Sequence, residues 1–295
     1  MKLGIFDISR AHFYGIAQRE LYIKLPDEDQ DPADTEPMCG ILNRSMCGTQ
    51  DASHIWQQDY TDHMVKNDYR FGDGSKAIFY NEAADTRGLV HGDDFLVLAD
   101  EDGIQRFEDM LKQKYVVKRT GLLGPDPGDD KEVVMLNRVL AWKDACGPNE
   151  TIEVEADSRH AELIVKQLGL TNAKGVDTPS VKRADAEETQ CESEAVLPGR
   201  EGTLYRSCTM RAAYLSTDRI DIGETVKNLA RSMQNPKPTH MAELKRLGRY
   251  LKRYPNMKRR FPKQRFPTEV GVVGDADWAG CLKTRKSTSG VIGKF

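Results

Sequence analysis

Two adjacent carboxylates, Asp93 and Asp94, are the residues of this 295-residue chain whose types and spacing point most directly to chemistry. They lie in the stretch LVHGDDFLVL at residues 89–98, between two short runs rich in Val and Leu that are typical of buried strands. The pattern predicts a tight hairpin with the carboxylates at its tip and Gly92 easing the turn. A Gly-Asp-Asp turn is also common on protein surfaces, so the pair alone leaves both interpretations open.

A third carboxylate, Asp7, follows the apolar run at residues 3–6. If the strands are neighbours, three carboxylates converge on one edge of a sheet, where they cannot all stay ionised without a cation. Mg²⁺ is bound in proteins by a few carboxylates together with substrate phosphates. Two Mg²⁺ ions, with Mn²⁺ as an alternative, would activate an attacking hydroxyl and neutralise a leaving pyrophosphate. The residues therefore predict phosphoryl-transfer chemistry.

The elements that must position these carboxylates follow from the hydrophobic pattern. Apolar residues recur every three or four positions in residues 51–65 and 102–115, which predicts two amphipathic helices, the first capped by Thr49 or Asp51. Residues 20–25 alternate as a half-buried strand does, and residues 77–80 form a further short strand. This order predicts an α+β layer with helices against one face of an antiparallel sheet. Trp56 is expected in its core.

The rest of the chain is predicted from the same signals. The expected elements are a boundary loop at 121–131, strands at 133–140 and 151–154, a helix at 158–168, a polar linker at 173–198, helices at 204–233 and 240–254, a strand at 270–274 that ends in Asp275, and a last strand at 291–295.

The charge distribution is uneven although the net charge is only −3. Residues 26–37 are acidic, whereas residues 245–265 are basic and contain no acid. This basic segment is either a phosphate-gripping surface or a solvated helix face. Its helical part contains Lys245, Arg246, Arg249, Lys252 and Arg253.

The cysteines and the hydropathy indicate a reducing, non-membrane environment. The six cysteines form no CxxC pair and no zinc-like spacing, so reduced intracellular thiols are expected. The chain shows no signal peptide and no apolar run long enough to span a membrane.

Five blocks of sequence, the fourth in two parts, together resemble the copia-type (Pseudoviridae) LTR-retrotransposon Pol polyprotein. FDISRAHFYGIAQRELYIKLPDE is similar to the first palm motif of its reverse transcriptase, LNRSMCGTQDASHIW to the second, and HGDD to the family's Tyr-Val-Asp-Asp. Further on, YRSCTMRAAYLSTDRIDI and HMAELKRLGRYLK resemble the segments after the thumb, and GDADWAGCLKTRKSTSG resembles the opening of the family's ribonuclease H domain. The blocks occur in the family's order across nearly the whole chain.

The resemblance implies roles for particular residues. Asp7, Asp93 and Asp94 match the catalytic, Mg²⁺-binding carboxylates of the polymerase, and Asp275 matches the first metal ligand of ribonuclease H. Gly48 matches the glycine beside the template and the incoming nucleotide, and His12, followed by Phe13, stands where the family has a residue beside the ribose. Arg10 is expected either to touch the triphosphate or to be a surface residue. The basic residues between 245 and 253 are implied to contact the template–primer duplex.

The resemblance also implies a division of the chain. Residues 1–120 correspond to a palm with incomplete fingers, 121–180 to a thumb, 181–268 to a linker and connection, and 269–295 to a truncated start of the ribonuclease H-like α/β domain. Because the other ribonuclease H carboxylates are not in this chain, no RNA cleavage is expected from it.

The chain departs from the family pattern around the second motif. The family's Lys-Gln-Ala-Pro-Arg is here Gln-Asp-Ala-Ser-His at residues 50–54, which loses two basic residues and gains Asp51. The aromatic residue that blocks the ribose 2′-hydroxyl in the family is replaced by His12. These changes suggest a decayed or partial copy of an element.

The expected function is RNA-directed DNA polymerisation by two-metal nucleotidyl transfer. Its partners would be an RNA template, a DNA primer, dNTPs and other parts of the Pol polyprotein, in a cytoplasmic virus-like particle or the nucleus; the oligomeric state is not predicted. One alternative is a catalytically dead remnant that still binds nucleic acid. Another is a different palm-type nucleotidyltransferase such as a cyclase, which has no use for a ribonuclease H opening.

Overall fold

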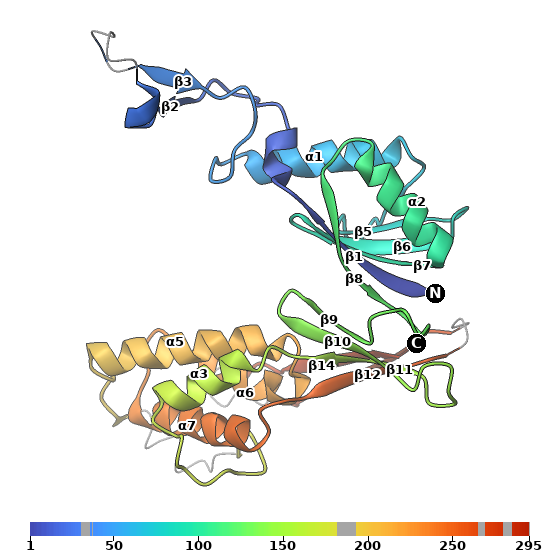
Figure 1. Cartoon of the computed structure of the whole chain (residues 1–295). Helices are drawn as coiled ribbons and strands as arrows, with labels where there is room; N and C mark the ends of the chain where they lie inside the picture. The colour runs from blue at the N-terminus through green and yellow to red at the C-terminus, as the bar shows by residue number, and fades with distance from the viewer. Residues whose placement is uncertain (31–35, 37, 182–192, 265–268, 280–284, 295) are drawn as a thin grey trace.

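The computed structural model describes residues 1–30, 36, 38–181, 193–264, 269–279 and 285–294 (Figure 1). Several sequence-based expectations fall wholly or partly outside the described residues: the acidic stretch 26–37, the polar linker 173–198, the end of the basic segment at Arg265, and Cys191 and Cys281.

The N-terminal layer is a six-stranded antiparallel sheet with the strand order β4-β5-β6-β7-β1-β8. Its strands are β1 (Lys2–Ile8), β4 (Arg70–Phe71), β5 (Ile78–Asn81), β6 (Thr86–His91), β7 (Asp94–Ala99) and β8 (Val117–Leu123). The prediction of a loop at 121–131 is wrong for residues 121–123, because these residues continue β8 and pair with β1. Buried Leu123, opposite Leu3, is why the chain stays extended there.

Two helices, α1 (Ala52–Val65) and α2 (Glu101–Lys112), cover one face of this sheet (Figure 1). The predicted apolar stripes are confirmed, since the residues that form them are buried. Asp100 caps α2 by accepting a hydrogen bond from the Gly103 backbone N–H at 2.7 Å. A side-chain cap on α1 was wrongly predicted: Thr49 bonds the Met46 carbonyl instead, and Asp51 binds Arg19.

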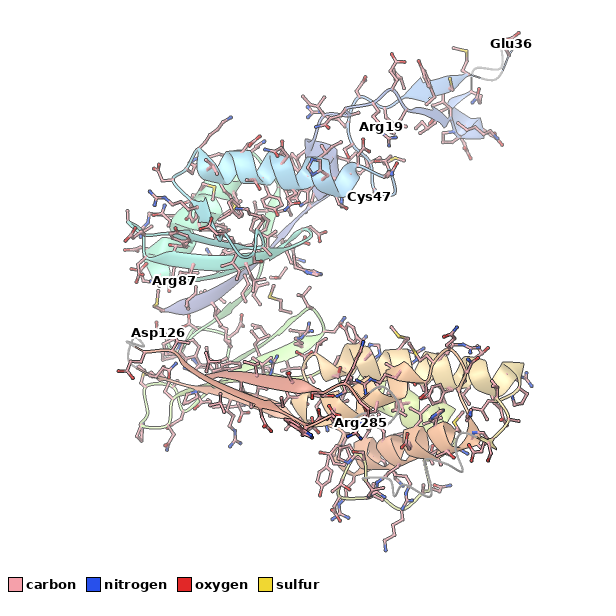
Figure 2. All side chains as sticks on the ribbon, turned by 180° about the vertical axis from the view of Figure 1, so that it is seen from behind. Arg19, Glu36, Cys47, Arg87, Asp126 and Arg285 are labelled. Atoms are coloured by element: carbon pink, nitrogen blue, oxygen red, sulfur yellow. The ribbon has the colours of Figure 1, made fainter. Side chains whose placement is uncertain are left out.

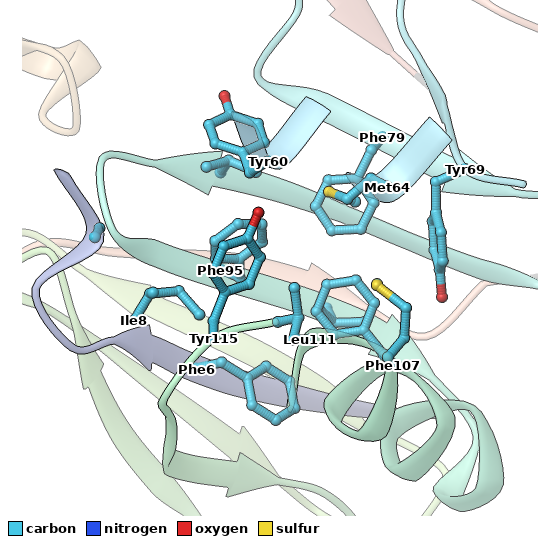
Figure 3. Packing of buried hydrophobic residues seen from close by; sticks show 14 of the residues in the cluster. Phe6, Ile8, Tyr60, Met64, Tyr69, Phe79, Phe95, Phe107, Leu111 and Tyr115 are labelled. Atoms are coloured by element: carbon cyan, nitrogen blue, oxygen red, sulfur yellow. The ribbon is translucent and has the colours of Figure 1, made fainter. Parts of the chain in front are cut away.

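Aromatic side chains form the core between the helices and the sheet (Figure 3). Phe107 of α2 is fully buried at its centre. Its ring stacks on Phe79, with centroids 5.5 Å apart, and meets Tyr69 at 5.6 Å and Phe6 at 5.7 Å. Such offset and edge-on arrangements add to the stabilisation from apolar burial. This core gives the sheet a rigid support.

A two-stranded arm leaves this layer after the 3₁₀ helix η1 (Ala11–Tyr14). It consists of β2 (Tyr22–Lys24) and β3 (Cys39–Ile41), with η2 (Asp27–Asp29) after β2, and it projects away from the sheet (Figure 1). The predicted half-buried alternation is confirmed, because Ile23 is partly buried between exposed Tyr22 and Lys24.

The second layer combines a four-stranded sheet with a bundle of helices (Figure 1). Its strands are β9 (Glu132–Met135), β10 (Arg138–Lys143), β11 (Thr151–Glu155) and β12 (Lys258–Pro262), and its helices are α3 (Arg159–Gln167), α5 (Gly199–Ser216), η3 (Ile220–Ile222), α6 (Gly223–Arg231) and α7 (Pro238–Arg253). The sheet order is β12-β11-β10-β9. It pairs β12, which lies in the predicted linker and connection at 181–268, with β11, which lies in the predicted thumb at 121–180.

Two expectations for this layer are corrected. The single strand expected at 133–140 is a hairpin, because Leu136 and Asn137 both take positive φ values and reverse the chain. The helix expected at 204–233 is broken between α5 and α6. Arg219 is buried at that break, where it binds Asp221 at 2.7 Å and the Tyr254 carbonyl at 2.8 Å.

The two layers share a small apolar core formed by Ile5, Leu123, Val133, Met135 and Leu140. It lies on the face of the first sheet opposite α1 and α2, because Ile5 alternates with Phe6, which packs on α2. The identification of the first layer as a polymerase palm stays a prediction, as do the thumb and ribonuclease H assignments.

The C-terminal hairpin pairs β13 (Gly271–Ala276) with β14 (Ser289–Lys294). Asp275 was expected at the end of a strand, but it lies within β13, opposite Gly290. In the described part of the chain, no helix has the length and apolarity needed to cross a membrane.

Candidate functional site

The hairpin predicted around Asp93 and Asp94 is present between β6 and β7. Its two-residue turn is formed by Gly92 and Asp93, and Gly92 has a φ of +66°. A positive φ at the first central residue suits the right-handed twist of the flanking strands, and glycine takes it without strain.

We expect Gly92→Ala to destabilise the protein by about 1 kcal/mol, because an added Cβ at this positive φ is strained even though the space around it is open. Gly128→Ala is the matched control, since Gly128 is equally open and has no positive φ. Urea denaturation of both variants measures the difference. Equal free energies of unfolding for the two variants would contradict the role given to the Gly92 turn.

The register of β1 and β7 brings the third carboxylate to this hairpin. Asp7 lies directly opposite Asp94, and the Ile8 backbone N–H donates a hydrogen bond to the Asp93 carbonyl at 3.1 Å. Opposite residues of an antiparallel pair project from the same face, so Asp7 and Asp94 share the face away from the helices. The structure thus brings together the three carboxylates that were predicted to converge.

The electrostatics of the site follow from this crowding. Partial burial raises the pKa of Asp94, and the negative charges of Asp93 and Asp7 raise that pKa further, while His91 acts in the opposite direction. A cation bound beside Asp94 would offset this repulsion. Oxygen donors of this kind suit Mg²⁺ or Mn²⁺, and the binding of a metal by these three residues stays a prediction.

A tighter acidic trio lies elsewhere in the described part of the chain. Donor atoms of Glu101, Asp126 and Asp129 lie within 4.8 Å of one another. Lys2 Nζ forms ion pairs with all three carboxylates, at 3.0 Å from Asp126 and 2.8 Å from Asp129. The hydrogen bond to Asp129 is the main cause that raises the pKa of Lys2. Because this ammonium group occupies the centre of the trio, the cluster has a structural role.

Trp56 of α1 holds the turn of the hairpin from the helix side. Its indole Nε1 donates a hydrogen bond to the Gly92 carbonyl at 2.8 Å. The ring is buried and packs edge-on against Tyr60 and Tyr115 at centroid distances of 5.4 and 5.3 Å. The prediction that Trp56 is a core residue is confirmed, but sequence reasoning missed its bond to the carboxylate hairpin. Its place in the second motif was the signal that could have indicated it.

The first and second motifs lie against each other beyond the end of β1. The Ser45 backbone N–H donates to the Gly15 carbonyl at 3.0 Å, and Arg44 donates to the Tyr14 carbonyl at 2.8 Å. Across this contact, His12 Nδ1 lies 3.3 Å from Cys47 Sγ. Cys47 lies near the start of α1, at the base of the arm (Figure 2). No role at the site is predicted for this cysteine from the sequence.

The other predicted nucleotide-site residues are exposed around this contact. Arg10 has a left-handed backbone with a φ of 56°, and Phe13 on η1 is 45 % exposed. Gly48 has a φ of +96° and open space where a side chain would be. Their exposure leaves them accessible to a ligand, and their contact with a nucleotide stays a prediction.

Asp51, the acid gained in the second motif, forms an ion pair with Arg19. Arg19 donates two hydrogen bonds to the Asp51 carboxylate, at 2.9 and 3.2 Å, and these lower the pKa of Asp51 (Figure 2 labels Arg19). The added negative charge is thus offset within the chain.

The basic segment is largely engaged by the chain itself. On α7, Arg249 and Lys252 donate to the carbonyls of Lys174 and Ala173 at 2.7 Å. The remaining pairings are Arg246 with Thr178, Arg253 with Asp177, Lys258 with Glu155, Arg259 with Asp218, Arg260 with Glu153 and Lys263 with Glu150. Lys245 on α7 is exposed. The carboxylate partners offset the charges of Arg253 and of the basic residues from 258 to 263, whereas Arg246, Arg249 and Lys252 bond neutral groups and stay cationic.

Asp275, the predicted ribonuclease H ligand, is exposed on β13. Its carboxylate accepts a hydrogen bond from the Ala276 backbone N–H at 2.9 Å, and nearby Asp277 accepts one from the Thr288 backbone N–H. Both bonds are local to the hairpin, and the metal-binding role of Asp275 stays a prediction.

Comparison with known proteins relates the chain to a retrotransposon Pol polyprotein. Over 289 residues, 97 % of the chain, it is 24 % identical to the retrovirus-related Pol polyprotein from transposon RE1 of Arabidopsis thaliana, of which it spans 18 %. It is 28 % identical over 143 residues to an uncharacterized mitochondrial protein of the same plant, which covers 46 % of the chain and 53 % of that protein.

A third similarity covers a shorter segment. Over 92 residues the chain is 38 % identical to secreted RxLR effector protein 161 of Plasmopara viticola, which covers 31 % of the chain and 64 % of that protein. No family model matches the chain. The similarity along nearly the whole chain supports the relation to Pol polyproteins that the sequence motifs indicated.

Proposed function

We propose that this chain is a polymerase portion of a copia-type Pol polyprotein and adds deoxynucleotides to a primer on an RNA template. The observation that carries this proposal is the register that sets Asp7 opposite Asp94, with Asp93 in the adjoining turn. The similarity to a retrotransposon Pol polyprotein over 97 % of the chain supports the same assignment.

Asp7, Asp93 and Asp94 would hold the Mg²⁺ ions of this reaction. Mg²⁺ held there would lower the pKa of the attacking hydroxyl and would neutralise charge on the leaving pyrophosphate. The protein itself supplies a fixed arrangement of carboxylates, since the β1–β7 ladder and the Trp56 hydrogen bond hold the hairpin from two sides. Preorganised charge of this kind needs little rearrangement during reaction.

The surrounding residues are proposed to receive the substrates. Arg10, His12, Phe13 and Gly48 would border the dNTP and the template base, and the exposed parts of α7 would contact the RNA–DNA duplex. Other parts of the Pol polyprotein would complete the enzyme, in a cytoplasmic virus-like particle or the nucleus. The ribonuclease H reaction is not proposed for this chain.

Primer extension tests the proposal. The purified chain should extend oligo(dT) on poly(rA) with dTTP and Mg²⁺, and Asp93→Asn should abolish extension. Omission of Mg²⁺ is the matched control for the metal requirement. If the folded wild-type chain binds the duplex but gives no extension above the Asp93→Asn background, the polymerase proposal is wrong.

The alternative of an inactive remnant that binds nucleic acid rests on the altered second motif, where Gln50 and His54 replace the two basic residues of the family pattern and Asp51 adds an acid. Duplex binding without extension, weakening with salt, would favour this alternative. The ion pairs of Arg259, Arg260 and Lys263 with carboxylates leave these residues less charge to offer to phosphates, so we expect the salt dependence to come from α7.

A further inference from the structure

The contact between Cys47 and His12 joins a nucleophilic atom to a proton acceptor. Cys47 Sγ and His12 Nδ1 are 3.3 Å apart, within the range of a hydrogen bond to sulfur. The two residues are 35 positions apart in sequence and are held together by the backbone contacts of Ser45 with Gly15 and of Arg44 with Tyr14. A thiol beside an imidazole is the arrangement that activates cysteine as a nucleophile.

The thiol is also accessible from solvent. Cys47 is exposed, and the next residue, Gly48, has no atom within 4 Å of the position where a Cβ would be. A small reagent can therefore approach the sulfur. Cys208, by contrast, is buried in the core of the helical bundle, where burial raises the pKa of its thiol.

We propose that Cys47 and His12 form a reactive pair that takes up small disulfides, such as glutathione disulfide, as a mixed disulfide on Cys47. His12 accepts the thiol proton, the Cys47 sulfur attacks one sulfur of the disulfide, and the S–S bond of the reagent breaks. The other half leaves as a thiolate and takes a proton from water or from His12. The small disulfide is the oxidant, so the protein thiol is oxidised as the leaving thiol is formed.

The adduct has a consequence that rests on the proposed polymerase function. Cys47 immediately precedes Gly48, which is proposed to border the incoming nucleotide, so a bulky group on the sulfur would obstruct that site. Extension would then stop on treatment with glutathione disulfide and return on reduction. The reactivity of the pair, however, depends on no polymerase activity.

The test measures modification rates at individual cysteines of the full chain. Folded protein at pH 7 is treated separately with iodoacetamide and glutathione disulfide, and adducts are quantified by peptide mass spectrometry. Cys39 and Cys146 are internal references, because both are exposed and His12 contacts Cys47 rather than either of them. Because His12 Nδ1 lies within hydrogen-bond distance of the Cys47 sulfur and can take its proton during attack, we expect Cys47 to react at least about threefold faster than the two references.

The His12→Asn variant should bring the rate at Cys47 down to the rates at Cys39 and Cys146. The buried Cys208 should stay unmodified, which reports that the variant is folded. Equal rates at all three cysteines of the wild type would overturn the proposal, as would a fast Cys47 that His12→Asn leaves unchanged. Extension by Cys47→Ser, relative to its own untreated sample, should be insensitive to glutathione disulfide. If no extension occurs at all, the proposed function fails, but the rate comparison still decides whether Cys47 and His12 form a reactive pair.

Discussion

Asp94→Asn should slow primer extension at least about 1000-fold, as expected when a site loses about 4 kcal/mol of stabilisation of the reacting charges. The reason is that Asn removes one anionic oxygen donor from the trio while keeping the shape of the side chain. Single-turnover extension with saturating Mg²⁺ and dTTP measures the loss. Asp7→Asn should give a loss of similar size, because Asp7 lies directly opposite Asp94.

Asp94→Asn should also make the metal-free protein slightly more stable. The pKa of Asp94 is raised above its ordinary value of 3.8, so the folded state binds more protons than the unfolded state just above that pH. The free energy of unfolding therefore falls as pH rises from 3.8 through the folded-state pKa, and it stays lowered at pH 7. Because Asp94 is only partly buried, we expect Asp94→Asn to recover about 0.5 kcal/mol at pH 7.

The binding of Mg²⁺ by Asp94 can also be measured independently of activity, through the melting temperature. Added Mg²⁺ should raise the melting temperature of the wild type by preferential binding to the folded state and should raise that of Asp94→Asn much less. Asp73→Asn is the matched control, since Asp73 is an exposed carboxylate in the β4–β5 connection. Extension by Asp94→Asn within tenfold of the wild type would refute the catalytic assignment of this residue.

Phe107→Ala should lower the free energy of unfolding by about 3–5 kcal/mol, the largest stability effect that we expect. The fully buried ring contacts Phe6, Tyr69 and Phe79, and its removal leaves a cavity in the core that supports the sheet. Urea denaturation followed by tryptophan fluorescence measures the loss, because Trp56 is buried in the same core.

Gln105→Ala on the exposed side of the same helix is the control for Phe107→Ala. Gln105 bonds Asp109 and Arg119 at the surface, so its removal should change the free energy of unfolding by no more than about 0.5 kcal/mol. A loss below 1 kcal/mol for Phe107→Ala would show that the aromatic cluster is not closely packed.

The parts of the site that sequence could predict are those with strong local signals. Alternating and helical hydrophobic patterns specified α1, α2 and the hairpin of β6 and β7, because burial on one face imposes the period of each element. The convergence of Asp7 with Asp93 and Asp94 followed once the strands were taken as neighbours. Its register, however, was visible only in the β1–β7 pairing.

The parts that sequence could not predict depend on contacts between distant residues. Residues 121–123 look like the start of a loop, and only pairing with β1 makes them strand. Arg219 looks like a surface residue, yet its pairing with Asp221 and two carbonyls buries it at the break between helices. The bonds from Trp56 to Gly92 and from Cys47 to His12 likewise join segments 36 and 35 residues apart.

The place of β1 within the first sheet has a consequence for how the chain folds. This strand is synthesised before its neighbours β7 and β8, which begin only at Asp94 and Val117. Contacts between residues so far apart close slowly, because a long loop must be ordered before they form. A nascent chain therefore carries an unpaired apolar strand until both partners have left the ribosome, and we expect this interval to be when it is most prone to aggregate or to need a chaperone.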